Sequence, residues 1–154
     1  MKNIQKGRSM VEMLGVLAII GVLSIGGIAG YTTSMNRYRA NQIMDAAAKV
    51  AVLAQTANQG QGGNVYAGAK GSGNCASGAT DSGIQWETIG GVTGFCAEST
   101  EGSDTVKVTL NGTDISAAVK QAILNIAGDS NSAANGVMGG TGFNGTDTLI
   151  IRSN

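Results

Sequence analysis

Residues 13–30 read MLGVLAIIGVLSIGGIAG, an apolar run of eighteen residues without a charged side chain. About twenty apolar residues cross a bilayer as an α-helix. The next charge after the run is Arg37, so the uncharged stretch is long enough to span a membrane. Lys2, Lys6 and Arg8 precede the run, and basic flanking residues favour retention in the cytoplasm. The sequence therefore predicts a single membrane span, with the residues that follow it exported.

The composition argues against several classes of function. Ten Lys and Arg residues balance ten Asp and Glu residues, so the net charge is zero and no basic surface favours nucleic acid. Histidine, the commonest metal ligand and the usual general base, is absent, and the chain has only two cysteines. We therefore expect no enzymatic activity, no cofactor, no metal and no bound nucleic acid.

The pattern of the apolar run leaves three interpretations open. A cleaved secretory signal has a basic start, a shorter apolar core of about 7–15 residues and a small-residue cleavage site, which Gly27 and Ala29 could supply. A plain membrane anchor explains the length of the run. Neither explains Glu12 at its start, because a carboxylate costs about 2.5–3.5 kcal/mol at the bilayer centre, although less near the headgroups.

The third interpretation rests on a family resemblance. Residues 6–31, KGRSMVEMLGVLAIIGVLSIGGIAGY, resemble the class III leader of type IV pilins and pseudopilins. In that family a short basic leader ends in glycine, a prepilin peptidase cuts behind this glycine, and the fifth mature residue is glutamate. The matching residues here are Gly7, Arg8 as the new and N-methylated terminus, and Glu12. The family usually begins its mature chain with Phe or Met, so Arg8 is a departure, as is the missing mid-helix proline.

The resemblance implies a structural subunit of a type IV pilus or pilus-like filament. Its partners would be further copies of the chain, the prepilin peptidase, an inner-membrane assembly platform and the membrane itself. The precursor would span the bacterial inner membrane once with its head in the periplasm, and the mature subunit would then join a filament that can reach the cell surface. The apolar helices would bundle in the filament core, and Glu12 would neutralise the amino group of a neighbouring Arg8.

Two alternatives remain open at this point. A pseudopilin of a type II secretion system has the same membrane chemistry and forms a short, piston-like filament. A small exported binding protein would instead lose the apolar run by signal cleavage. The N-terminus of the mature protein separates the second alternative from the other two, because it would be Arg8 for a pilin or pseudopilin and a residue near Gly30 for a secreted protein.

A helical pattern continues beyond the apolar run. Eight residues recur at helical spacing, with Ile43, Ala47 and Ala54 beside them: Tyr31, Met35, Tyr38, Gln42, Ala46, Val50, Leu53 and Ala57. Charged residues fall mainly elsewhere, which is typical of an amphipathic helix. We predict one long helix over residues 8–58, roughly 75 Å long at 1.5 Å per residue. Its apolar half contains the transmembrane or filament-core segment 13–30, and its second half packs on a globular head.

The rest of the chain predicts an antiparallel sheet of about four strands and a second helix. The expected strands are residues 84–89, 92–98, 105–110 and 148–152, with Gly90-Gly91 as a hairpin turn. The expected helix covers about 115–127, with Thr113 or Asp114 as its N-cap and Gly128 at its end. The glycine-rich segments 60–83 and 128–147 are predicted to be loops.

Cys75 and Cys96 are expected to form a disulfide, because an exported head lies in an oxidising compartment. Such a bridge stabilises a head by about 3 kcal/mol in the chain-entropy model. The alternative is a pair of reduced core cysteines.

The remaining polar motifs predict turns. The sequons Asn111-Gly112-Thr113 and Asn144-Gly145-Thr146 are interpreted as turns, and the scattered residues Asp104, Asp114, Asp129 and Asp147 favour the same positions. Calcium binding by these aspartates, as in some pseudopilins, is the alternative.

The predicted fold class is α+β and, by the resemblance, type IV pilin-like. A long N-terminal α-helix packs on an antiparallel β-sheet head that also carries a short second helix. The expected division of the chain is a leader peptide at 1–7, the long helix at 8–58 and a periplasmic or surface head at 59–154.

Overall fold

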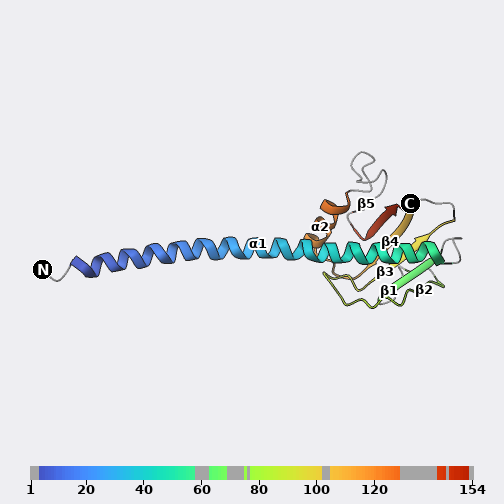
Figure 1. Ribbon diagram of the computed structural model, residues 1–154, viewed down its shortest axis with the longest axis horizontal. Coiled ribbons are helices and arrows are strands. Elements are labelled where there is room, and N and C mark those ends of the chain that lie inside the picture. Colours follow the sequence, from blue (N-terminus) through green and yellow to red (C-terminus); the bar gives the residue numbers. More distant parts are fainter. Residues whose placement is uncertain are drawn as a thin grey trace. The chain divides into compact units, whose positions relative to one another are not determined.

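The computed structural model describes residues 4–57, 63–68, 75, 77–101, 105–128, 142–144 and 146–152. A long N-terminal helix, a mixed sheet and a short second helix confirm the predicted α+β class (Figure 1). The chain divides into two compact units, Met1–Met35 and Asn36–Asn154. The second unit, called the head unit below, contains the end of the long helix together with the strands and the second helix.

Helix α1 (Ile4–Thr56) has 53 residues and confirms the predicted long helix almost to its end. It continues through Gly21, Gly26 and Gly27, because a glycine costs a helix only about 1 kcal/mol and the residues around these glycines continue the hydrogen bonding. Every described side chain from Met10 to Ser34 is exposed. Among the described residues, α1 is the one helix long and apolar enough to cross a membrane.

The buried face of α1 in the head unit differs from the predicted stripe. Tyr38 and Leu53, expected on the buried side, are 57% and 37% exposed. The buried residues are Ala46 and Val50 of the predicted stripe, Ile43, Ala47 and Ala54, which were expected beside it, and in addition Ala40 and Ala51. Small side chains let the helix backbone approach the sheet closely, so the buried face is shifted toward the alanines and away from Tyr38 and Leu53.

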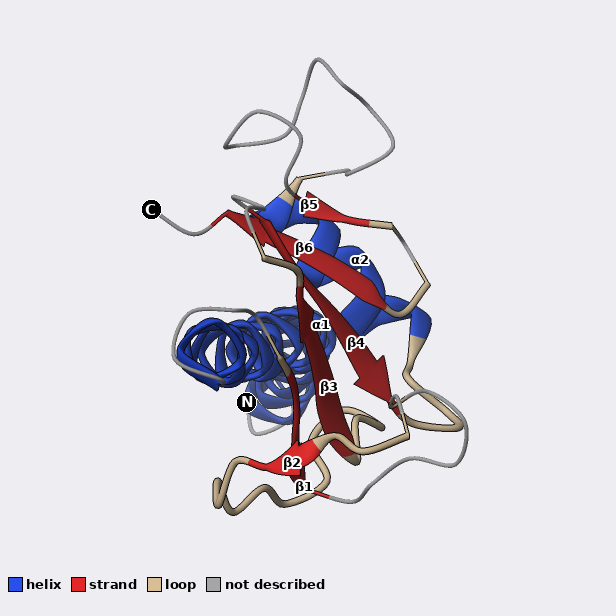
Figure 2. Cartoon of the chain, turned by 90° about the vertical axis from the view of Figure 1, so that its right-hand side faces the viewer, coloured by secondary structure: helices blue, strands red, loops and turns tan. Residues whose placement is uncertain are grey.

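The head unit is built on one six-stranded sheet, in the order β2-β1-β3-β4-β6-β5 (Figure 2). Its strands are β1 (Asn64–Gly68), β2 (Thr80–Asp81), β3 (Gly94–Ser99), β4 (Thr105–Asn111), β5 (Gly142–Phe143) and β6 (Thr148–Arg152). The sheet is antiparallel except at one edge, where β1 and β2 run parallel. The expected antiparallel sheet is therefore correct for four of these five strand pairs.

Alternation along the strands gives the sheet two different faces. One face belongs to the hydrophobic core, which unites it with α1 and the second helix; its members include Val65, Phe95, Val108 and Leu149. Cys96 and the residues two positions away from it along β3 point to the other face, outside this core. The sheet therefore separates the core from a surface that carries the cysteine.

One strand prediction needs correction. Residues 84–88 form no strand in the structure, and Ile89 makes only an isolated bridge to Val92. The alternation that suggested a strand arises because Ile84 and Trp86 pack inward while Gln85 and Glu87 are exposed. Trp86 donates from Nε1 to the carbonyl oxygen of Val92 at 3.0 Å, so side-chain packing rather than ladder pairing holds this segment.

The glycine-rich segments are not loops throughout. The 60–83 segment contains β1 and β2, and the 128–147 segment contains β5. Val65 and Ala67 of β1 are buried, but the strand is short and lies among glycines, so its own residues give little strand signal. Strand β1 forms because its five residues pair with five residues of β3.

The predicted turn at Gly90-Gly91 is confirmed, although it joins only the isolated Ile89–Val92 bridge and not two strands, and the second helix is confirmed with a different N-cap. Gly90 and Gly91 have φ of +61° and +89°, and a Cβ atom at Gly91 would collide with the carbonyl of Asp114, so this turn requires glycine. Helix α2 (Ala117–Ala127) ends at Gly128, as predicted, but its N-cap is Ser116, whose hydroxyl accepts from the amide of Val119 at 3.3 Å. Thr113 and Asp114 precede the cap.

Candidate functional site

The residues of the predicted leader and assembly site lie at the beginning of α1. Gly7 and Arg8 belong to its backbone, so the predicted cleavage point falls at the end of its first turn, and the side chain of Arg8 lies outside the described part. Glu12 is exposed four residues beyond Arg8, which is about 6 Å along the helix axis. The predicted pairing of Glu12 with the amino group of a neighbouring copy stays a prediction.

The segment from Met10 to Ser34 is an apolar surface that nothing in its own unit covers. The larger side chains are 53–74% exposed, among them Ile20 and Ile25. Glu12 is the only charged residue of the segment. Exposed apolar surface on this scale marks a site that contacts a membrane or another protein.

Three hydroxyl groups of this segment find acceptors within the helix. Ser24 Oγ donates to the carbonyl oxygen of Ile20 at 2.7 Å, and Thr32 and Thr33 both donate to that of Ala29, at 3.0 and 3.1 Å. A hydroxyl without a partner is costly in hydrocarbon. These bonds make the segment compatible with an apolar environment despite its polar residues.

The structure joins the two cysteines, as predicted. Cys75 and Cys96 form a disulfide with their Cα atoms 5.3 Å apart. Cys96 is buried on β3, whereas Cys75 is half-buried in the segment before β2. The bridge therefore ties this segment to the centre of the sheet.

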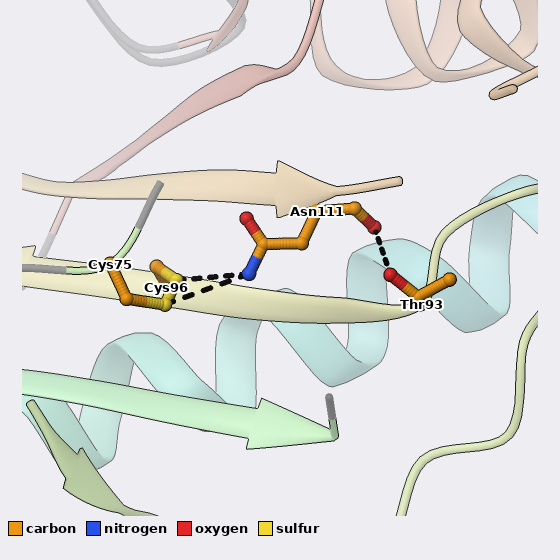
Figure 3. The surroundings of a disulfide bond; sticks show 4 residues. All are labelled: Cys75, Thr93, Cys96 and Asn111. Carbon is orange, nitrogen blue, oxygen red and sulfur yellow. Dashed lines mark hydrogen bonds between the residues drawn. A yellow bond between two sulfur atoms is a disulfide. The ribbon is translucent and has the colours of Figure 1, made fainter. Parts of the chain in front are cut away.

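Asn111 stands beside the disulfide, and sequence reasoning placed it only in a turn (Figure 3). It is the last residue of β4, and its side chain is buried, with 1% exposed. Its Nδ2 lies 3.0 Å from Cys96 Sγ and 3.6 Å from Cys75 Sγ, whereas its Oδ1 is buried without a hydrogen-bond partner among the described residues. A buried polar atom without a partner costs about 1–3 kcal/mol.

The backbone explains why Asn111 reaches the sulfurs. Cys96 is opposite Thr109 in the β3–β4 register, and Asn111 follows two residues later on the same face. The carbonyl oxygen of Asn111 also accepts from the amide of Thr93 at 2.7 Å and from its hydroxyl at 3.1 Å. Its burial also leaves no exposed amide at this sequon for a glycan.

The second sequon does form a turn. Asn144 Oδ1 accepts from the amides of Thr146, Asp147 and Thr148 at 2.8–3.0 Å, the arrangement of an Asx turn. Of the aspartates considered for calcium, Asp104 and Asp129 lie outside the described residues. The described part of the chain holds no cluster of three His, Cys, Asp or Glu residues.

A groove of about 480 Å³ follows the outer face of α1 in the head unit. Val52, Leu53 and Ile84 contribute to its lining, and so do Lys49 and Asp45, whose charged atoms lie 2.7 Å apart. Asp45 and Lys49, the acidic and the basic residue of this groove, therefore form a salt bridge with each other.

Comparison with known proteins found no family model, no curated protein and no solved structure that matches this chain. The function has to be inferred from the residues and the geometry of the chain itself.

Proposed function

We propose that the chain is a structural subunit of a type IV pilus or pilus-like filament. In this proposal it is inserted in the inner membrane, cleaved by a prepilin peptidase between Gly7 and Arg8, and polymerised through α1. The observation that carries the proposal is the exposed apolar segment from Met10 to Ser34, with Glu12 as its single charge near the beginning. This combination requires an apolar environment and a cation near Glu12.

A bundle of such helices meets the first requirement. Burial of apolar surface contributes about 25 cal/mol per Å², so about 1,000 Å² per subunit supplies tens of kcal/mol before the entropic costs of assembly. The membrane covers the same surface while the subunit is a monomer. Gly15, Ala18 and Gly21 favour close contact between helices, since small residues allow backbones to approach.

The amino group of Arg8 in an adjacent subunit meets the second requirement. A carboxylate in the dry core of a filament is costly without a partner, and attraction between opposite charges strengthens as the surroundings become less polar. The pairing would also set the stagger between neighbours. Continuity of α1 across residues 26–30 supports this proposal over signal cleavage near Gly30, since the helix offers no extended segment there.

The test is the N-terminus of the chain expressed with a prepilin peptidase. Intact-mass measurement should show a chain that begins at Arg8, with an added methyl group. Gly7→Val should leave the full-length precursor in the membrane, because the peptidase requires a small residue before the bond. Gly15→Val is the matched control, since a Cβ atom there meets nothing within 4 Å, and it should be processed normally. Normal processing of Gly7→Val, or a terminus near Gly30, would contradict the proposal.

A further inference from the structure

The side chain of Asn111 makes its hydrogen bonds to the two cysteine sulfurs. Its Nδ2 is 3.0 Å from Cys96 Sγ and 3.6 Å from Cys75 Sγ, while its Oδ1 is buried without a partner among the described residues. An apolar side chain of similar size would avoid that unsatisfied oxygen. Packing alone therefore does not explain why this position carries an amide. The group of this side chain that makes hydrogen bonds, Nδ2, points to the sulfur atoms (Figure 3).

The strength of the hydrogen bond from Asn111 Nδ2 depends on the oxidation state of the cysteines. A sulfur atom in a disulfide is a weak hydrogen-bond acceptor. A thiolate carries a full charge, and hydrogen bonds to charged groups are roughly twice as strong as those between neutral groups. The Asn111 amide thus interacts more strongly with the reduced, ionised form of Cys96 than with the bridged form.

We propose that Asn111 stabilises the Cys96 thiolate and thereby promotes closure of the Cys75–Cys96 disulfide. Burial alone disfavours a charged thiolate on Cys96, which is 2% exposed. In the bridged form the Asn111 donor lies 3.0 Å from Cys96 Sγ, and in this proposal it opposes that effect by favouring the charged form of the reduced thiol. The proposal concerns maturation of the head unit and is independent of filament assembly.

The disulfide forms in two steps, and the exposure of the two cysteines determines which of them reacts in the first step. Cys75 is half-buried and Cys96 is buried, so an oxidant reaches Cys75 first. With a small disulfide such as glutathione disulfide, the Cys75 thiolate attacks one sulfur, a mixed disulfide forms and one glutathione thiolate leaves. The Cys96 thiolate then attacks Cys75 Sγ, the Sγ–Sγ bond forms, and the second glutathione thiolate leaves. Two protons and two electrons leave the protein, and glutathione disulfide becomes two molecules of glutathione.

Few other charges act on Cys96 from the surrounding elements. Tyr66 is its register partner on β1, and Asp81 is opposite Tyr66 on β2. Glu98 and Lys107 lie on the same face of β3 and β4, and their charged atoms lie 3.7 Å apart, so their charges largely offset each other. The Asn111 amide donates a hydrogen bond to this sulfur at 3.0 Å.

The test is the rate of the second step as a function of pH. The full-length chain in detergent micelles is reduced and converted to the mixed disulfide with glutathione disulfide, and acid-quenched samples are followed by mass spectrometry. In Asn111→Leu the midpoint of the rate–pH curve should rise by about one unit. Closure at pH 7 should be about three- to tenfold slower, because a less acidic thiol is ionised less often but attacks more strongly once ionised.

Asn111→Asp keeps the shape of the side chain and places a negative charge beside Cys96, so its midpoint should rise further. This variant decides the question if the leucine variant does not fold. Thr109→Val is the matched control, because Thr109 is the register partner of Cys96 on β4 and makes no hydrogen bond to sulfur in the described structure. Its midpoint should equal that of the unmodified chain.

A purely structural role for Asn111 would slow closure equally at every pH and leave the midpoint in place. That result, or an equal shift in Thr109→Val, would overturn the proposal.

Discussion

Glu12 shows what a single residue contributes to this chain. It is the only charged residue between Met10 and Asn36, and it is exposed at the beginning of the apolar segment. In a membrane the nearby headgroups can solvate its carboxylate. In a filament core the headgroups are gone, so the proposed pairing with the amino group of Arg8 becomes the main compensation.

Glu12→Val should therefore separate insertion from assembly. The variant should be cleaved and inserted normally, because valine suits the membrane at least as well as glutamate. Its filament yield should fall by about tenfold or more, since truncation of one member of a buried charge pair leaves the other unpaired. Electron microscopy of sheared filaments and immunoblots of the membrane fraction measure the two effects.

The control is Glu87→Val, which removes an exposed carboxylate from the head unit and should assemble normally. Normal yield and length of Glu12→Val filaments would show that the carboxylate is not needed for assembly.

The start of α2 shows how one cap stabilises an element. The Ser116 hydroxyl accepts from the amide of Val119 at 3.3 Å, and this amide also donates to the carbonyl oxygen of Ser116 at 3.0 Å. Ser116→Ala should lower the free energy of unfolding of the head unit by about 1 kcal/mol. Thr113→Ala, at one of the two caps predicted from the sequence, should change it by less than about 0.5 kcal/mol. Urea unfolding followed by circular dichroism measures both, and equal losses would place the cap elsewhere.

The alanine face of α1 shows how an element is positioned on the sheet. Ala47 is fully buried in the core, whereas Ala48 is exposed one residue later. Ala47→Leu should destabilise the head unit by about 1–3 kcal/mol, because extra volume in a packed core displaces its neighbours. Ala48→Leu adds the same atoms on the outer face and should be nearly neutral. Thermal unfolding of the two variants compares them, and equal stability would show that the helix and the sheet are not closely packed.

At the scale of the molecule, the core of the head unit does not use the apolar half of α1. Its buried members run from Ala40 to Leu149, and none comes from the first compact unit. A fragment that begins at Asn36 should therefore fold, stay soluble without detergent and retain the Cys75–Cys96 bridge. Size-exclusion chromatography, circular dichroism and thiol labelling check these three properties. A fragment that is unfolded or aggregated would show that residues before Asn36 complete the fold.

Local patterns in the sequence were sufficient for several parts of this protein. The apolar run and the absence of proline predict α1, because a helix needs only contacts a few residues apart. The β6 segment was predicted with its observed bounds, and the α2 segment within two residues of its beginning. The disulfide followed from the number of cysteines and the expected export of the head, without knowledge of the fold.

The candidate site could be predicted only in part. The leader motif names Gly7, Arg8 and Glu12 because these residues lie close together in the sequence. No sequence pattern connects Asn111 with Cys75, which lies 36 residues away. Their proximity depends on the register between β3 and β4 and on the path of the segment before β2.

The sequence by itself determined the two helices, the last strand, the apolar segment and the disulfide partners, because each depends on local periodicity or on simple counting. Only the tertiary structure decided that Tyr38 and Leu53 of α1 are exposed, that Ile84 and Trp86 pack inward without a strand, and that Asn111 faces sulfur. Those outcomes depend on contacts between residues far apart in the chain, where close packing and the pairing of neighbouring strands outweigh local preference.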